Sequence, residues 1–173
     1  AVGVGSATIA AIVMSHRIST RRLAAMTGAF ALLSKDFDEY RDKVYETVGL
    51  KKADEANVAH TKGKFAKNPP PTTPLDGSKS WFYDTTSDRY FPSTMETVKG
   101  AQNAVNYTLN NQGDASLNDF YEACGLGNTQ VGDMLGWDSE HHVELIFTPV
   151  LMAEGGAATA FRFAKNPVPK FWK

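Results

Sequence analysis

Three helix starts, each followed by a helix stop, stand one after another between Arg89 and Trp137. Every start is a hydroxyl residue, the type that caps a helix N-terminus by accepting a backbone N–H bond; the three are Ser93, Ser116 and Thr129. The first two have an acidic residue three positions later, which is the spacing of a capping box. Every stop is a glycine, a residue that tolerates the left-handed conformation at helix ends; the three are Gly113, Gly125 and Gly136. The pattern predicts three consecutive helices, the third of them short.

These predicted helices carry apolar faces that need a common core. We assign Phe120, Tyr121 and Trp137 to that core, with Trp137 as a lid behind the third helix. Five aromatic residues among positions 81–91 are interpreted as a non-helical segment that fills the same core, in preference to a binding surface. Residues 81–137 are therefore predicted to form a compact helical block.

The N-terminal part of the chain has two different patterns. Residues 1–19 begin with an apolar run rich in small residues, which favours the end of a membrane span with its beginning missing over a buried helix. Residues 20–49 are predicted to be one amphipathic helix, because its apolar residues alternate at spacings of three and four. Leu23, Phe30 and Phe37 lie on this stripe. They pack either against their own domain, which the aromatic side chains favour, or against a copy of the helix.

The remaining segments complete the predicted organisation. Residues 50–80 are rich in lysine and proline and are interpreted as a linker, with a stiff polyproline stretch near its end. Residues 138–173 read as a β-hairpin followed by an extended tail, in which Phe171 and Trp172 are expected to bind a groove, on a neighbouring chain rather than on the hairpin. The predicted fold class is α+β, mostly α: a long N-terminal amphipathic helix, a linker, a small helical block and a C-terminal β-hairpin.

Composition and motifs argue against several functional classes. The net charge of −1 makes nucleic acid an unlikely partner. The chain has no phosphate-binding loop, nucleophile elbow or zinc pattern, so we expect no catalytic residue and no cofactor. Adjacent His141 and His142 would point to opposite sides of a strand, which makes them a poor metal site. The single cysteine, Cys124, is interpreted as a buried structural thiol.

Four segments of the chain carry a resemblance to known proteins: FYD at 82–84, RYFPSTMETV at 89–98, ASLNDFYEACGL at 115–126 and GDMLGW at 132–137. Through them, most of the chain outside the linker resembles small proteins of unknown function encoded by phages and prophages of Gram-positive bacteria. The resemblance implies hydrophobic segments before the helical block and an origin in a phage. It implies no catalytic residue, because no activity is attached to the family.

Two functional hypotheses follow. The first is a non-enzymatic phage-associated protein, a minor structural or assembly component of the virion that contacts other phage proteins or copies of itself. The alternative is a phage or prophage protein anchored in the host membrane through residues 1–14, with a cytoplasmic binding module. An enzyme without a recognisable motif ranks third. The expected location is accordingly the virion or the host membrane, and otherwise the host cytoplasm.

Overall fold

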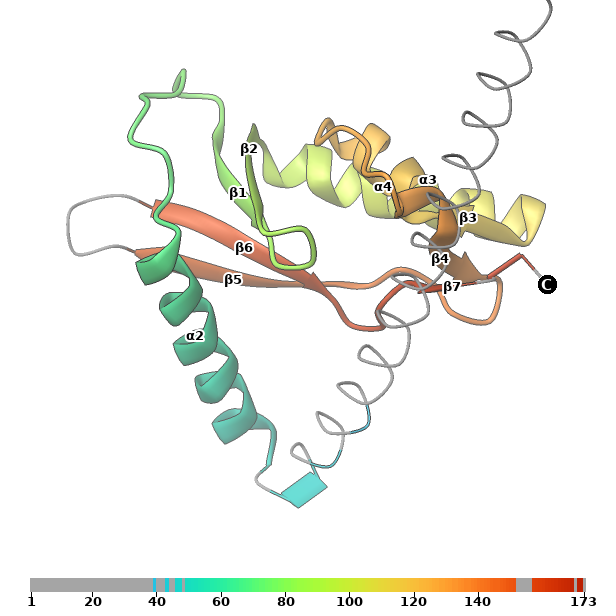
Figure 1. Cartoon of the computed structure of the whole chain (residues 1–173), viewed down its shortest axis with the longest axis horizontal. Coiled ribbons are helices and arrows are strands. Elements are labelled where there is room, and N and C mark those ends of the chain that lie inside the picture. The colour runs from blue at the N-terminus through green and yellow to red at the C-terminus, as the bar shows by residue number, and fades with distance from the viewer. Residues whose placement is uncertain are drawn as a thin grey trace, which may run out of the picture.

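The computed structural model of the chain describes residues 49–151, 157–169 and 171–172, together with the single positions 39, 43, 46 and 47 (Figure 1). The predicted apolar segment and most of the long N-terminal helix, with Leu23, Phe30 and Phe37, lie outside the described residues. Of the described residues, 40% are in helices and 28% are in strands, and the strands form two sheets. The expectation of a mostly helical protein is therefore wrong.

The order of elements alternates between helices and short strands. The helices of the described part are α2 (Leu50–Lys67), α3 (Met95–Gln112), α4 (Leu117–Cys124) and the short 3-10 helix η1 (Gly132–Met134). The strands are β1 (Ser80–Asp84), β2 (Arg89–Ser93), β3 (Asp114–Ser116), β4 (Leu135–Asp138), β5 (Leu145–Leu151), β6 (Ala157–Phe163) and β7 (Val168–Pro169).

The larger sheet consists of two hairpins placed side by side, in the order β2-β1-β6-β5. β1 and β2 are antiparallel, as are β5 and β6, which confirms the C-terminal hairpin expected from the sequence. The hairpins join through a parallel pairing of β1 with β6, in which Phe82 lies opposite Thr159. The smaller sheet has the order β3-β4-β7 and is antiparallel throughout.

Alternate residues of a strand point to opposite sides of a sheet. The larger sheet accordingly has a helix packed on each of its faces. On one face Phe82 and Phe161 pack with α3, α4 and the smaller sheet into the main core. On the other face Tyr83 and Ala160 belong to a second cluster around Phe65 of α2. Figure 1 shows α2 on one side of the sheet and α3 with α4 on the other. The main core thus covers one face of the sheet, and the C-terminal end of α2 packs on the other.

Both edge strands of the larger sheet contain a proline. Pro92 lies in β2 and Pro149 in β5, and both are exposed. Proline has no N–H to offer a further strand, and it is confined to edges or bulges for that reason. Neither edge therefore presents an uninterrupted row of donors to another chain.

The helix boundaries follow the predicted signals at both ends of α4 and at the C-terminal end of α3. Helix α4 begins with the expected capping box of Ser116 and Asp119 and ends at left-handed Gly125. Helix α3 ends at Gly113, but its N-cap is Thr94, one residue later than predicted. Ser93 is instead the last residue of β2, where it lies opposite Ser80.

The third predicted helix is reduced to the single turn of η1. The chain then continues into β4, in which Gly136 and Trp137 pair with β3. Strand pairing with β3 therefore replaces the helix that the Thr129 and Gly136 signals suggested. With β1, β2, β3 and β4 inside it, the segment 81–137 is a mixed unit and not a helical block.

The expected linker at 50–80 also has to be corrected. Its first part forms α2, an 18-residue helix, and only the following stretch up to residue 79 has no helix or strand. The apolar residues of α2 do not form a stripe, so the hydrophobic pattern did not predict this helix. Within the described residues, no helix has the length and apolar character needed to cross a bilayer.

The C-terminal tail docks on its own chain. Strand β7 pairs with β4, and the ring of Phe171, which is buried, lies over Gly136. A side chain at Gly136 would collide with this ring and with the Ala115 carbonyl, so the close approach requires glycine there. The expectation of docking on a neighbour is therefore wrong for Phe171. Trp172 remains 52% exposed.

Candidate functional site

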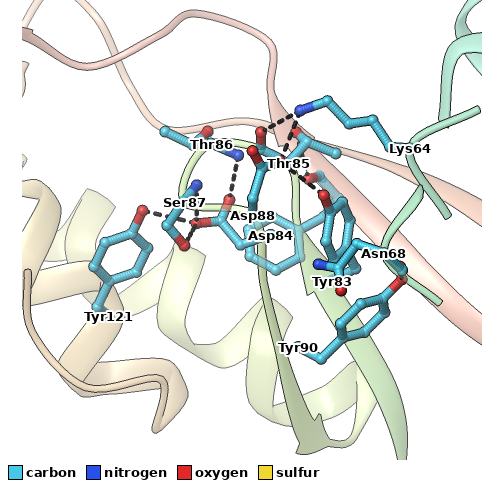
Figure 2. A network of polar contacts seen from close by, with 11 residues as sticks. Lys64, Asn68, Tyr83, Asp84, Thr85, Thr86, Ser87, Asp88, Tyr90 and Tyr121 are labelled. Atoms are coloured by element: carbon cyan, nitrogen blue, oxygen red, sulfur yellow. Dashed lines mark hydrogen bonds and ion pairs between the residues drawn. The ribbon is translucent and has the colours of Figure 1, made fainter. Parts of the chain in front are cut away.

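The deepest polar side chain of the described structure is Asp84, at the end of β1, where the chain turns into β2. We refer to the turn residues 84–89, together with Lys64, Tyr83 and Tyr121, as the turn network. Figure 2 shows how side chains from α2, the sheet and α4 converge on it. It is the best candidate for a site because buried carboxylates are uncommon unless they have a structural or chemical role.

Four hydrogen bonds hold the Asp84 carboxylate, which is fully buried. Its Oδ1 accepts from the Thr86 backbone N–H at 3.0 Å. Its Oδ2 accepts from the backbone N–H and hydroxyl of Ser87, at 3.1 and 2.6 Å, and from the Tyr121 hydroxyl at 2.7 Å. This donor set replaces the water that a buried carboxylate loses. Burial raises the pKa of Tyr121, and the neighbouring Asp84 carboxylate raises it further.

Arg89 ties the same turn to helix α4 and the loop behind it. Its Nε donates to the Ser87 hydroxyl at 2.9 Å, and its Nη1 donates to the carbonyls of Leu126 and Gly127. The guanidinium lies 4.8 Å from the centre of the Tyr121 ring, a cation–π distance. Its Nη2 is buried without a hydrogen-bond partner in the described structure. The arginine thus joins α4 to the turn in two ways: by the cation–π contact with Tyr121 and by the hydrogen bonds of its N–H groups.

Asp88 connects the turn to helix α2. It has a left-handed backbone with a φ of 54°, which aspartate tolerates better than most residues. Its Oδ1 accepts from the Tyr83 hydroxyl at 2.7 Å and from Lys64 Nζ at 2.8 Å. Burial alone would raise the pKa of Asp88, but the hydrogen bonds from Lys64 and Tyr83 lower it below its usual value. Burial and the bond to Asp88 raise the pKa of Tyr83.

Two further contacts complete the network. The backbone N–H and the hydroxyl of Thr85 both donate to the carbonyl of Phe161 in β6. The Tyr90 hydroxyl donates to the carbonyl of Asn68, just behind α2, at 2.8 Å. One turn therefore connects α2, both hairpins of the larger sheet and α4.

The geometry of the turn network favours a structural role over catalysis. A serine nucleophile needs a base that can take its proton, and that base must be open to substrate. The partner of Ser87 is Asp84, whose two oxygens are already held by backbone amides and Tyr121 and which is closed to solvent. The arrangement can position chain segments, but it leaves no room for a substrate atom at the carboxylate.

Phe120, Tyr121 and Trp137, which the sequence assigned to the core, lie inside the main cluster. The aromatic residues of 81–91 were expected in the same core, but they divide between two clusters: Phe82 and Phe91 lie in the main one, and Trp81, Tyr83 and Tyr90 lie in the second. Trp137 is 1% exposed, and Phe120 and Tyr121 are fully buried. The Trp137 ring lies 4.9 Å from that of Phe163, and its Nε1 donates to the Lys165 carbonyl at 3.0 Å. Trp137 thus lies within a strand of the core instead of closing it as a lid.

The two histidines belong to separate local contacts. The Nδ1 of His141 lies 2.7 Å from Asp138 Oδ1, and the Nε2 of His142 lies 2.7 Å from Asn110 Oδ1. Burial would raise the pKa of Asp138, but the hydrogen bond from His141 and its charge lower it. In the described part of the chain no three His, Cys, Asp or Glu side chains are placed to hold a metal ion.

Cys124 is buried in the main core near the end of α4. Burial raises the pKa of its thiol to about 11. At pH 8 the thiolate, which is the reactive form, is therefore scarce. We expect Ellman's reagent to modify the folded protein at least about 100-fold more slowly than the protein in urea. Equal rates in the two conditions would contradict the buried position.

Sequence reasoning missed Asp84, Asp88 and Lys64. A signal for the first two was present, because the polar residues 84–88 stand between two aromatic runs, as in a hairpin with a side-chain-stabilised turn. Lys64 had no such signal, because its partner Asp88 is 24 positions away. The residues Leu23, Phe30 and Phe37 cannot be placed relative to the network, since they lie outside the described residues.

Comparison with known proteins gives a family and no activity. The model of a family of unknown function (DUF6353) matches residues 1–172. No curated protein and no solved structure matches the chain.

Proposed function

The chain belongs to the family of unknown function DUF6353, and from its own geometry we propose that it is a non-enzymatic protein that acts through protein–protein contacts. The observation that carries this proposal is Trp172, whose side chain is 52% exposed beside the buried Phe171 ring, 4.8 Å away. Tryptophan is enriched at the centres of protein interfaces, where it buries a large apolar area.

The turn network supports the same proposal, because it offers no open catalytic group. Its buried carboxylate is used to join segments of the chain, so the deepest polar group does not point into a cleft. An enzyme normally keeps such groups open to a substrate. The edge prolines Pro92 and Pro149 further direct any contact of the larger sheet to side-chain surfaces instead of strand addition.

We propose further that the contacts are those of a phage, with the chain as a minor structural or assembly component that meets other phage proteins or its own copies. The support for this step is the resemblance of the four segments between residues 82 and 137 to phage and prophage proteins. It is independent of the argument from Trp172, so the two parts can be tested in one experiment with separate outcomes.

Mass spectrometry of particles purified from the phage that encodes the chain tests both parts. We expect the wild-type chain in the particles and at least about tenfold less of a Trp172→Asp variant, since an interface tryptophan contributes more than a factor of ten in affinity. Tyr107→Asp is the matched control, because Tyr107 is an exposed aromatic residue on α3, at 71%. We expect it to be incorporated normally.

Absence of the wild-type chain from particles would contradict the virion proposal and favour the membrane-anchored alternative. Normal incorporation of the Trp172→Asp variant would contradict the role of Trp172. Circular dichroism of each purified variant checks that a missing protein is not simply an unfolded one.

A further inference from the structure

Helix α2 is attached to the sheet by its C-terminal end. In its last two turns Thr61 and Phe65 are buried, at 7% and 0% exposure, and Lys64 is half-buried. Toward its N-terminal end the described side chains of Lys52, Glu55 and Ala56 are exposed. Figure 1 shows the same arrangement, with the C-terminal end of α2 at the sheet and the rest of the helix directed away from it.

The attachment is centred on one aromatic side chain of α2, Phe65, which is buried in the second cluster with Tyr83, Val150, Ala158 and Ala160, and it includes a small number of polar contacts. Phe65 meets the edges of the Tyr83 and Tyr90 rings, with centroids 5.1 and 5.5 Å away. Lys64 Nζ donates to Asp88 at 2.8 Å and to the Thr85 carbonyl at 3.1 Å. We call the two tyrosines the aromatic socket. A single buried ring and a half-exposed ion pair make a much smaller contact than the one between α3 and the main core.

The sequence of α2 does little to stabilise the helix away from the sheet. It has no apolar stripe, and its N-terminus has no side-chain cap, because the residue in that position is Gly49. Helices of this length are marginal in water on their own. The twelve residues that follow, 68–79, contain no helix or strand, and the hydrogen bond from Tyr90 to the Asn68 carbonyl ties their first residue to the sheet. Elements with few buried contacts open at lower free energy than the core does.

We propose that α2 is a reversible latch: its C-terminal end leaves the sheet while α3, α4 and both sheets stay folded, and its release uncovers the aromatic socket. The proposal goes beyond the function proposed above, because it concerns motion within one chain and needs no partner. In the closed state the latch fixes α2 to the turn network through Asp88. In the open state α2 is free of this attachment.

Hydrogen exchange of the full chain, read by mass spectrometry at peptide resolution, tests the latch. We expect the amides of α2 to exchange at least about 100-fold faster than the central amides of α3, since they open without global unfolding. Lys64→Met, which removes both polar contacts, should raise exchange in α2 about threefold and leave α3 unchanged. Lys62→Met is the matched control on the exposed side of the same helix, and methionine and lysine have similar helix propensities.

A second variant tests whether α2 opens on its own or only when the whole protein unfolds. Phe65→Ala should remove protection from α2 and increase binding of a fluorescent apolar dye, while protection in α3 and the sheets is kept. The proposal is overturned if α2 and α3 exchange at the same rate in the wild type. It is equally overturned if Phe65→Ala unfolds the whole protein, or if Lys62→Met and Lys64→Met have the same effect.

Discussion

Replacement of Asp84 by alanine is expected to lower the free energy of unfolding by about 3–5 kcal/mol, the range for breaking a buried charged network. The change leaves the Tyr121 hydroxyl, the Ser87 hydroxyl and two backbone N–H groups without their acceptor. Each buried unsatisfied group costs about 1–3 kcal/mol, partly relieved if water enters. Urea denaturation followed by circular dichroism measures the difference.

Two companion variants make this result specific. Asp84→Asn keeps the shape and one accepting oxygen, so it should have a smaller effect than alanine. Asp76→Ala removes an exposed carboxylate whose bond is to the nearby Ser78, and it should leave the urea midpoint unchanged. If Asp84→Ala unfolds at the wild-type midpoint, the turn network does not stabilise the fold.

Replacement of Trp137 by alanine is expected to cost about 3–5 kcal/mol as well, as for other large-to-small changes in a core. The indole is 1% exposed, packs on Phe163, and donates its N–H to the Lys165 carbonyl. The change creates a cavity and leaves that carbonyl without its side-chain donor. Because Trp137 pairs with Ala115 in the smaller sheet, the loss should also loosen the contact of β3 with β4.

Trp172→Ala is the matched control for this prediction, because Trp172 is the same residue type at 52% exposure. We expect a change within about 1 kcal/mol, since exposed positions seldom contribute more. Equal destabilisation by the two substitutions would show that the tail contributes to the core as much as β4 does. Thermal unfolding of both variants at one protein concentration gives the comparison.

The sequence predicted best those elements whose signals are local. The capping box of Ser116 and Asp119 and the terminal glycines of α3 and α4 depend on residues within one turn of each other, and the structure has them. The C-terminal hairpin was likewise predicted from the sequence, and β5 and β6 form it. Boundaries moved where a strand competed for the same residue, as at Ser93 and Gly136.

The elements that the sequence did not predict depend on distant partners. Helix α2 has no apolar periodicity, and the centre of its contact with the sheet is one ring, Phe65, which packs against both Tyr83 and Tyr90. Strand β1 has its parallel partner in β6, more than 70 positions later. Neither the pairing nor the contact of Tyr121 with Asp84 could be read from spacing. The candidate site was missed for the same reason, because its members come from α2, the first hairpin and α4.

The position of β6 in the larger sheet sets an order of events during synthesis. β6 lies between β1 and β5, so one of the two inner strands of this sheet is the last of its four to be made. Until Phe163 has left the ribosome, β1 lacks its parallel partner β6. Phe82 also lacks Phe161, which shares the main core with it in the folded protein. Contacts of such long sequence separation form late and slowly. A nascent chain that stops before residue 157 therefore leaves apolar surface open to chaperones, and the sheet closes only after translation of the second hairpin.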